Sequence, residues 1–207
     1  ENLRSFARAL SDRDEIHFSG GEPTVNNYLR IFLDELIKCN SNATLLIRTN
    51  ANNWPSKMHE LMKQFNTKIS ISIDAYGKAN EYIRWPSSWN KTAKNVDKII
   101  SLPNTQVKLN PTVAAYNTHL LPRLYEWAVG VGIKKFNFDS VYTPEILAAN
   151  NSEQWQKDIY KEFCENNIHP QKVLNHVMKP GNGINETIDF LKILDYNRKT
   201  NYKVLGI

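Results

Sequence analysis

The sequence predicts an α/β fold, namely a partial, open barrel of parallel strands with a polar-lined interior. Five strand-like segments alternate with amphipathic helical segments, a pattern typical of parallel sheets with right-handed crossovers. Each strand has one apolar and one polar side, whereas a sheet covered by helices on both faces is apolar throughout. The chain has 207 residues, fewer than the roughly 250 typical of a closed eight-unit barrel. We therefore expect one sizeable barrel-like domain with its helices outside.

The first half of the chain alternates strands and helices at short intervals. The helical segments repeat apolar residues at i, i+3, i+4 and i+7, and the strand segments are rich in β-branched residues. Pro55 stands where proline is favoured, in the first turn of a helix. Strands are expected at residues 15–19, 44–49 and 68–74, and helices at residues 1–10, 25–37 and 55–65.

The second half continues the alternation and then becomes helical. Strands are expected at residues 106–113 and 135–141, and helices at residues 89–100 and 120–128. Asn151 and Gln154 resemble a helix-capping pair, and a Pro-Gly break precedes a short helix at residues 188–194. We expect residues 1–150 to form the barrel and residues 151–207 a C-terminal helical extension.

Polar side chains line one face of every expected strand. They are His17, Ser19, Arg48, Asn50, Ser70, Ser72, Asp74, Lys108, Asn110, Thr112, Asn137 and Asp139. Since the opposite faces are apolar, the polar faces should line a cavity in which a ligand sits. The polar residues of the last two strands either contact a substrate or satisfy one another, and the sequence leaves these two alternatives open.

Composition excludes several classes of protein. The net charge is +5, but the Lys and Arg residues are scattered, which favours a mildly basic surface over a nucleic-acid platform. No apolar run approaches the roughly 18 residues that span a bilayer, so no membrane partner is expected. Cys39 and Cys164 are far apart and match no metal-ligand spacing. We expect no metal site within these residues, and unpaired thiols suit a cytoplasmic location.

The pentapeptide Ser19-Gly20-Gly21-Glu22-Pro23 lies between a strand and a helix. Such corners carry the active sites of parallel α/β folds. Two glycines allow bare backbone to approach a ligand, and Pro23 favours an extended conformation at Glu22. This corner is therefore expected to offer main-chain polar groups to a ligand.

This motif resembles the Gly-Gly-Glu motif of radical S-adenosylmethionine (SAM) enzymes, and the resemblance implies a (β/α)6 TIM-like partial barrel. In that family the motif binds the amino group of SAM through its backbone. Thr49-Asn50 looks like the family's Thr-Asn-Gly, although Ala51 replaces the glycine, and Ser72-Ile73-Asp74-Ala75 looks like the motif that ends the next strand. The resemblance implies that Ser72 and Asp74 reach the ribose hydroxyls.

Two further segments extend the resemblance. Arg84 is similar to an arginine that meets the methionine carboxylate, a task suited to planar bidentate pairing. The segment from Thr112 to Asn117 resembles the branch with twitch or SPASM domains, as does Val141 to Pro144, so residues 151–207 are interpreted as the start of a twitch-like region. The implied SAM-binding residues are Ser19, Gly20, Gly21, Glu22, Asn50, Ser72, Asp74, Arg84 and Thr112, and no catalytic residue is assigned.

The family's Cys-x-x-x-Cys-x-x-Cys loop is absent from the sequence. In the family this loop holds a [4Fe-4S] cluster and follows the first strand. The resemblance therefore implies an N-terminal truncation before or within the first helix, with the cluster-ligating cysteines upstream of Glu1. A degenerate enzyme is the alternative, and on either interpretation this chain alone should be inactive.

The resemblance implies an enzyme that generates a 5′-deoxyadenosyl radical from SAM and abstracts a substrate hydrogen. The cofactors would be SAM and the [4Fe-4S] cluster, and the partners would include an electron donor. The twitch and SPASM branch implies a peptide or protein substrate. Two alternatives remain open: a catalytically inactive descendant that binds SAM or a partner, and an RNA-modifying radical SAM enzyme, which only the basic charge favours.

Overall fold

The computed structural model describes residues 2–167 and 171–207, and their contacts divide the chain into two compact units. The first unit comprises the residues up to Ser72 together with Asn90–Leu109 and Gly132–Lys135. The second comprises Ile73–Trp89, Asn110–Val131 and the residues from Phe136 to the C-terminal end. The expected division at residue 150 stays a prediction.

The first unit is built on a parallel sheet with the strand order β1-β2-β3-β4-β6. Its strands are β1 Glu15–Phe18, β2 Thr44–Thr49, β3 Thr67–Ile71, β4 Thr105–Leu109 and β6 Lys135–Phe136. Strands β1 to β4 pair in parallel, and residues pair one to one along each pair of neighbouring strands. Ile47 thus lies opposite Ile69, and Ile71 lies opposite Leu109. The predicted α/β class with parallel strands is confirmed.

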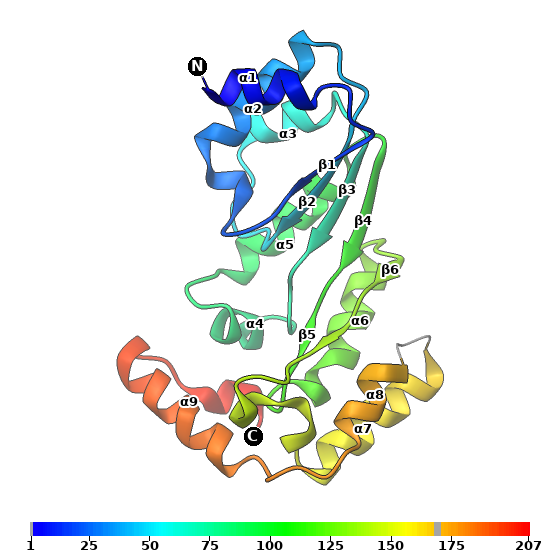
Figure 1. The fold of residues 1–207 in the computed structure, drawn as a ribbon. Coiled ribbons are helices and arrows are strands. Elements are labelled where there is room, and N and C mark those ends of the chain that lie inside the picture. The colour runs from blue at the N-terminus through cyan, green and yellow to red at the C-terminus, as the bar shows by residue number, and fades with distance from the viewer. Residues whose placement is uncertain (1, 168–170) are drawn as a thin grey trace. The chain divides into compact units, whose positions relative to one another are not determined.

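Helices cover the apolar face of this sheet. Figure 1 shows α1 Asn2–Leu10, α2 Asn27–Lys38, α3 Ser56–Met62 and α5 Trp89–Ile100 on one side of the strands. Alternate strand residues such as Leu45, Ile47 and Ile69 are buried, whereas Arg48 and Lys68 between them are exposed. This alternation is the one that the sequence predicts, because strand side chains point to opposite faces in turn.

Two strands expected to be continuous are interrupted, so those predictions are wrong. Residues 106–113 form β4 and a separate strand β5 Thr112–Val113, and residues 135–141 form β6 and β7 Asp139–Ser140. Pro111 explains the first break, because proline has no N–H to donate to a ladder. Strands β5 and β7 pair in parallel in a two-stranded sheet of their own.

The second unit is mainly helical. Its helices are α4 Lys78–Ile83, α6 Leu121–Gly130, α7 Gln154–Asn166, α8 Gln171–Val177 and α9 Asn185–Arg198. Short 3-10 helices are η2 Thr118–Leu120, η3 Glu145–Leu147, η4 Ala149–Asn151 and η5 Tyr202–Leu205, with η1 Pro23–Val25 in the first unit. Tyr82 of α4 packs in a buried cluster with Leu191 of α9 and Leu205 of η5.

Three helical expectations need correction. The capping box of α7 is formed by Glu153 and Gln156, not by Asn151 and Gln154. Helix α9 is longer than residues 188–194 and has little amphipathic periodicity, which explains why the sequence underestimated it. Helices α4 and α8 were not expected, because each is too short to establish a periodic pattern.

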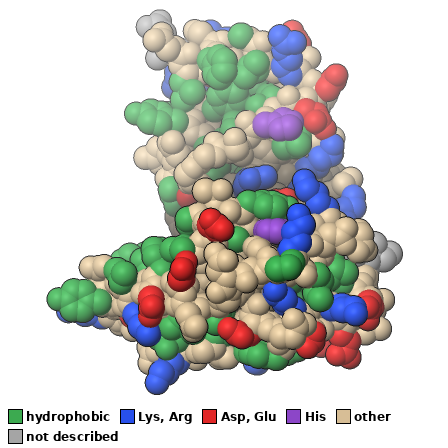
Figure 2. All heavy atoms as spheres, turned by 60° about the horizontal axis from the view of Figure 1, so that its bottom comes forward, with side chains coloured by type: hydrophobic (Ala, Val, Ile, Leu, Met, Phe, Trp, Pro, Cys, Tyr) green, Lys and Arg blue, Asp and Glu red, His purple; other side chains and the backbone are tan. Residues whose placement is uncertain are grey.

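Charged side chains of both signs are mixed on the face that Figure 2 displays. That mixture agrees with the scattered Lys and Arg residues of the sequence. Among the described residues, no helix combines the length and the apolar character needed to cross a membrane.

His119 joins three elements of the second unit. Its Nε2 lies 2.8 Å from the carbonyl oxygen of Leu205, and its Nδ1 lies 2.8 Å from the Gln156 side-chain nitrogen. Because a carbonyl only accepts, Nε2 carries the hydrogen and Nδ1 accepts from Gln156. The Gln156 amide cannot turn over freely, since its oxygen accepts from the Glu153 N–H at 2.7 Å. A second ring proton would therefore have no acceptor.

The free energy of unfolding should fall as the pH drops below about 6.5, in part because of His119. Burial lowers the pKa of His119 from 6.5, so its stabilisation is complete above that value and is lost as the pH falls towards the lower folded pKa. Urea unfolding between about pH 5 and 8 should give a smaller pH slope for His119→Gln, by up to about 1.4 kcal/mol per pH unit. An unchanged slope would contradict this account.

Candidate functional site

The Gly20-Gly21 corner has the backbone that only glycine adopts easily. The φ angles are +89° at Gly20 and +54° at Gly21, and a Cβ added at either would meet nothing within 4 Å. In the described part of the chain, no hydrogen bond engages the main-chain groups of these two residues. The corner therefore offers exposed peptide groups with open space beside them.

Glu22 holds this corner against the end of β2. One carboxylate oxygen accepts from the hydroxyls of Thr24 at 2.6 Å and Thr49 at 2.7 Å, and the other accepts from the Asn50 N–H at 2.7 Å. Glu22 is extended, with φ −121° and ψ 101°, which confirms the prediction from Pro23. Since its carboxylate is already engaged, Glu22 positions the corner and leaves ligand contact to the main chain.

The turn after β2 shows why a glycine was expected there. Ala51 has a φ of +55°, in the left-handed region that favours glycine. The Asn95 side chain from α5 donates to the Ala51 carbonyl at 2.9 Å, and Thr49 Oγ1 accepts from the Ala51 N–H at 3.0 Å. Asn50 uses its side-chain oxygen to accept from the Asn52 N–H. These bonds hold the turn in a conformation that alanine adopts at a cost.

Ser72 lies beside the same turn. Its N–H donates to the Thr49 carbonyl at 2.8 Å, which aligns Ser72 with Asn50 at the carboxyl ends of β2 and β3. The predicted residues Ser19, Gly20, Gly21, Glu22, Asn50 and Ser72 all belong to the first unit. Their roles towards SAM stay predictions.

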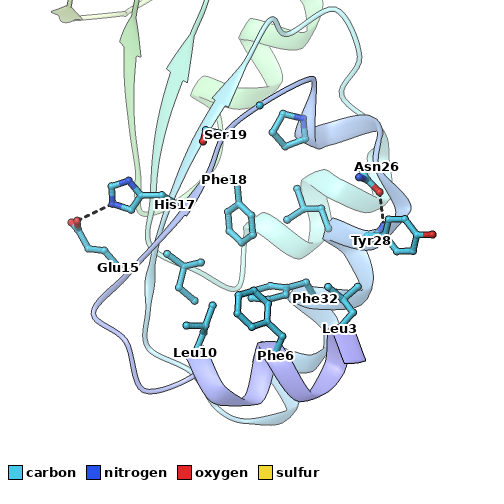
Figure 3. A pocket seen from close by; sticks show the side chains of 14 residues that line it. Leu3, Phe6, Leu10, Glu15, His17, Phe18, Ser19, Asn26, Tyr28 and Phe32 are labelled. Carbon is cyan, nitrogen blue, oxygen red and sulfur yellow. Dashed lines mark hydrogen bonds and ion pairs between the residues drawn. The ribbon is translucent and has the colours of Figure 1, made fainter. Parts of the chain in front are cut away.

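A pocket of about 470 Å³ adjoins the corner and is called the corner pocket here. Figure 3 shows Ser19 at its rim and the rings of Phe6, Phe18 and Phe32 facing one another within it. The Phe18 and Phe32 centroids are 5.5 Å apart in an edge-to-face arrangement. His17 and Glu15 lie on the opposite side of β1 in this view. Exposed peptide groups thus border an aromatic wall able to pack against a planar ring.

The other predicted residues, Asp74, Arg84 and Thr112, meet within the second unit. Asp74 Oδ2 lies 2.8 Å from Arg84 Nε in an ion pair without an aligned hydrogen bond, and Asp74 Oδ1 accepts from the Thr112 N–H at 2.8 Å. The Asp74 side chain is 8% exposed and that of Arg84 is 25% exposed. Asp74 and Arg84 therefore pair with each other here, and their expected roles towards ribose and carboxylate stay predictions.

Asn117 organises this cluster and was absent from the expected binding set. Its side-chain nitrogen donates to the carbonyl oxygens of Asp74 and Thr112, at 3.0 and 2.9 Å, and its oxygen accepts from the Ala114 N–H. Asn117 is fully buried. Nearby Tyr116 is partly buried, and desolvation of its hydroxyl together with the nearby Asp74 carboxylate raises the pKa of Tyr116 to about 12. In the sequence, Asn117 stood out only as the end of the segment Thr112 to Asn117, which resembles the twitch and SPASM branch.

Some polar residues of the last two strands satisfy one another in this structure, and their contact with a substrate stays a prediction. The side-chain nitrogen of Asn137 donates to Asn110 Oδ1 at 2.7 Å and to Asp139 Oδ2 at 3.2 Å, and Asn110 also donates to Asp139. These three side chains satisfy one another, and Thr112 joins the Asp74 cluster. Lys108 takes part in neither arrangement and lines a pocket on the sheet.

The described residues contain no group of three or more His, Cys, Asp or Glu side chains that could hold a metal ion. Cys39 and Cys164 are both free thiols. Burial raises the pKa of Cys164 to about 11, so it is not an activated thiolate. These residues therefore do not fit an iron-sulfur cluster.

Several solved structures are similar to this chain. The chain superposes on Streptococcus suis SuiB bound to S-adenosylmethionine with a TM-score of 0.57 and 12% identity, over 79% of this chain and 39% of that one. The fold is that of radical SAM enzymes. The radical S-adenosylmethionine methyltransferase TsrM from Kitasatospora setae, bound to tryptophan and a SAM analogue, gives 0.51 and 9%, over 67% and 29% of the chains.

Further similarities cover only part of each protein. anSMEcpe with bound AdoMet and a peptide gives a TM-score of 0.55 at 13% identity, over 79% of this chain and 49% of that one. An uncharacterized protein of Methanocaldococcus jannaschii is 26% identical over 145 residues, which are 67% of this chain and 50% of that protein. No protein-family model matches. The chain thus spans about half the length of the curated relative that it matches.

Proposed function

We propose that this chain is the SAM-binding part of a radical SAM enzyme. The observation that carries the proposal is the Gly20-Gly21 corner, whose exposed peptide groups have no partner in the described chain and have open space beside them. Main-chain carbonyls at such a corner can accept hydrogen bonds from an amino group, as SAM carries. The solved structures with this fold that contain bound SAM support the same ligand.

The proposal gives the other residues positioning roles. Glu22 fixes the corner to the end of β2 by hydrogen bonds from Thr49 and Asn50, and a third bond from Thr24 holds its carboxylate locally, so the main chain is preorganised before a ligand arrives. Asn50 and Ser72 would present amide and hydroxyl groups towards the ribose. Asp74 and Arg84 pair with each other here, and Asp74 also accepts from the Thr112 N–H, so their roles towards the ribose and the carboxylate would require the ion pair to open.

The proposal includes a [4Fe-4S] cluster held by cysteines outside this sequence. When bound, cluster and SAM together would supply the radical chemistry, with electrons from a separate donor. The substrate would be a peptide, since anSMEcpe and SuiB have been solved with peptides bound. Anaerobic reconstitution of a protein that includes a cysteine triplet should give bound iron and SAM cleavage. Iron-free protein that leaves SAM intact would favour the non-catalytic descendant.

Gly20→Ala should weaken SAM binding by about tenfold or more, because the added methyl group intrudes where the ligand meets the backbone. Binding can be followed by NMR shift changes, which detect weak complexes. Gly183→Ala is the matched control, since Gly183 also has a positive φ, +81°, and open space around it. Both variants should lose similar stability from backbone strain, and only Gly20→Ala should lose affinity. Equal SAM affinities of the Gly20→Ala and Gly183→Ala variants would refute the proposed site.

A further inference from the structure

A second pocket lies on the polar face of the first unit's sheet and is called the sheet-face pocket here. Its volume is about 570 Å³, and side chains from β1 to β4 line it. The lining contains four cationic side chains, Arg48, Lys68, Lys108 and Lys135, together with His17. Among the described residues that line the pocket there is no acidic side chain, so its local charge is positive.

The strand register builds a row across the floor of this pocket. Arg48 of β2 lies opposite Ser70 of β3, and Ser70 lies opposite Lys108 of β4. Neighbouring strands are about 4.8 Å apart, so the backbone positions of the two cationic residues lie about 10 Å from each other on either side of the serine. We call these residues the Arg48–Ser70–Lys108 row.

The Ser70 side chain is buried, and its hydroxyl has no hydrogen-bond partner among the residues that the structure describes. The residue is 7% exposed. A buried hydroxyl without a partner destabilises a fold. An acceptor atom entering the pocket between the two cations would supply the missing hydrogen bond.

The two cations of the row are also available. Lys68 is paired with Glu15 at 2.5 Å, and Lys135 donates to Gln106 at 2.9 Å. Arg48 and Lys108, by contrast, form no ion pair or hydrogen bond within the described part of the chain. Gln106 is uncharged, so Lys135 also keeps its positive charge, but its ammonium group is already engaged, whereas the donors of Arg48 and Lys108 stay available to a ligand.

We propose that the Arg48–Ser70–Lys108 row binds an oxyanion of the substrate, a carboxylate or a phosphate. Two cationic donors and one neutral hydroxyl donor match the acceptor atoms of such a group. Ser19 lines both this pocket and the corner pocket, so the anion would anchor a substrate next to the proposed SAM corner. The assignment of this anion to the substrate rests on the proposed function.

The test uses the 207-residue chain and three probes followed by NMR titration. The probes are inorganic phosphate, an acetylated and amidated Gly-Glu-Gly peptide, and its Gly-Gln-Gly counterpart. Arg48→Gln and Lys108→Gln should each weaken binding of the anionic probe by about tenfold. Lys57→Gln is the matched control, because Lys57 is exposed on α3 and does not line the pocket. It should leave affinity nearly unchanged.

Ser70→Ala separates binding from a structural role. If the hydroxyl serves the ligand, this variant should weaken anion binding and raise the Tm of the free chain by about 2–4 °C. A lower Tm together with unchanged affinity would overturn the assignment of Ser70.

The outcomes distinguish the sources of the anion and the two proposals. Tighter binding of the glutamate peptide than of the glutamine peptide supports a carboxylate, whereas binding of phosphate alone supports a phosphoryl group. Failure of both anions to bind, or binding unaffected by Arg48→Gln and Lys108→Gln, would overturn the inference. A chain that binds the anion but shows no SAM-dependent shifts at Gly20 would refute the proposed SAM site while the anion site stands.

Discussion

Glu22→Gln is expected to lower the free energy of unfolding by about 2–3 kcal/mol, because hydrogen bonds to a charged acceptor are each worth about 1.5–3 kcal/mol and not all are lost. The Thr49 hydroxyl and the Asn50 N–H both donate to Glu22. An amide offers only one acceptor atom, so at least one of these donors loses its partner. Thr49 is 2% exposed and has no ready access to replacement water.

The measurement is urea unfolding at neutral pH, with Glu60→Gln as the control. Glu60 forms an exposed pair with Lys63 on the surface of α3, so its neutralisation should change stability little. Glu22→Gln should also weaken SAM binding, because the corner would no longer be held in place. Equal stability losses in the two variants would show that Glu22 does not hold the corner.

Asp74→Asn is expected to cost about 2–4 kcal/mol, because it leaves the partly buried Arg84 cation without its counterion. The asparagine oxygen can still accept from the Thr112 N–H, so the loss reports mainly on the ion pair. Adding Arg84→Met should restore much of the stability, since the pair is then replaced by uncharged groups. Asp189→Asn breaks only an exposed pair with Lys192 and is the control.

The same variants test the expected role towards SAM. If Asp74 binds the ribose, Asp74→Asn and Asp74→Ala should both weaken SAM binding in NMR titrations. Unchanged affinity in a variant that remains folded would refute the ribose assignment. A double variant at Asp74 and Arg84 that is as unstable as Asp74→Asn alone would refute the energetic account of the pair.

The sequence predicted the first unit better than the second. Strands β1 to β3 and helices α2 and α5 have strong periodic patterns, because each buries one face against the others. Helix α3 is as short as α8, but its apolar spacing continues beyond the helix to the buried Phe65. The polar face of the sheet was likewise predicted from the alternation of residues such as Arg48 and Lys68. In the second unit, short elements such as α4, α8 and β7 bury too few residues to establish a period, and their conformation depends on tertiary contacts.

The candidate site shows the same limit. Local chemistry predicted the Gly20-Gly21 corner and the extended Glu22, because glycine and proline act on their own backbone. The hydrogen bonds of Glu22 to Thr49 and of Asn117 to Asp74 join residues distant in sequence. No pattern of residue spacing predicts hydrogen-bond partners that lie so far apart in the sequence. The sequence therefore identified which residues are special more readily than what each one contacts.

Both oxygens of the Glu22 carboxylate accept hydrogen bonds that hold the corner in place. A ligand at Gly20 and Gly21 therefore meets only peptide groups. Peptide groups carry no net charge and do not titrate. Recognition at the corner therefore depends on the shape and donor pattern of the ligand, and neither acid nor base changes the binding groups themselves. The sheet-face pocket is the opposite kind of receptor, since its cations act through charge and are sensitive to salt. The first unit thus combines an uncharged binding surface, the Gly20-Gly21 corner, with one that selects ligands by charge, the sheet-face pocket.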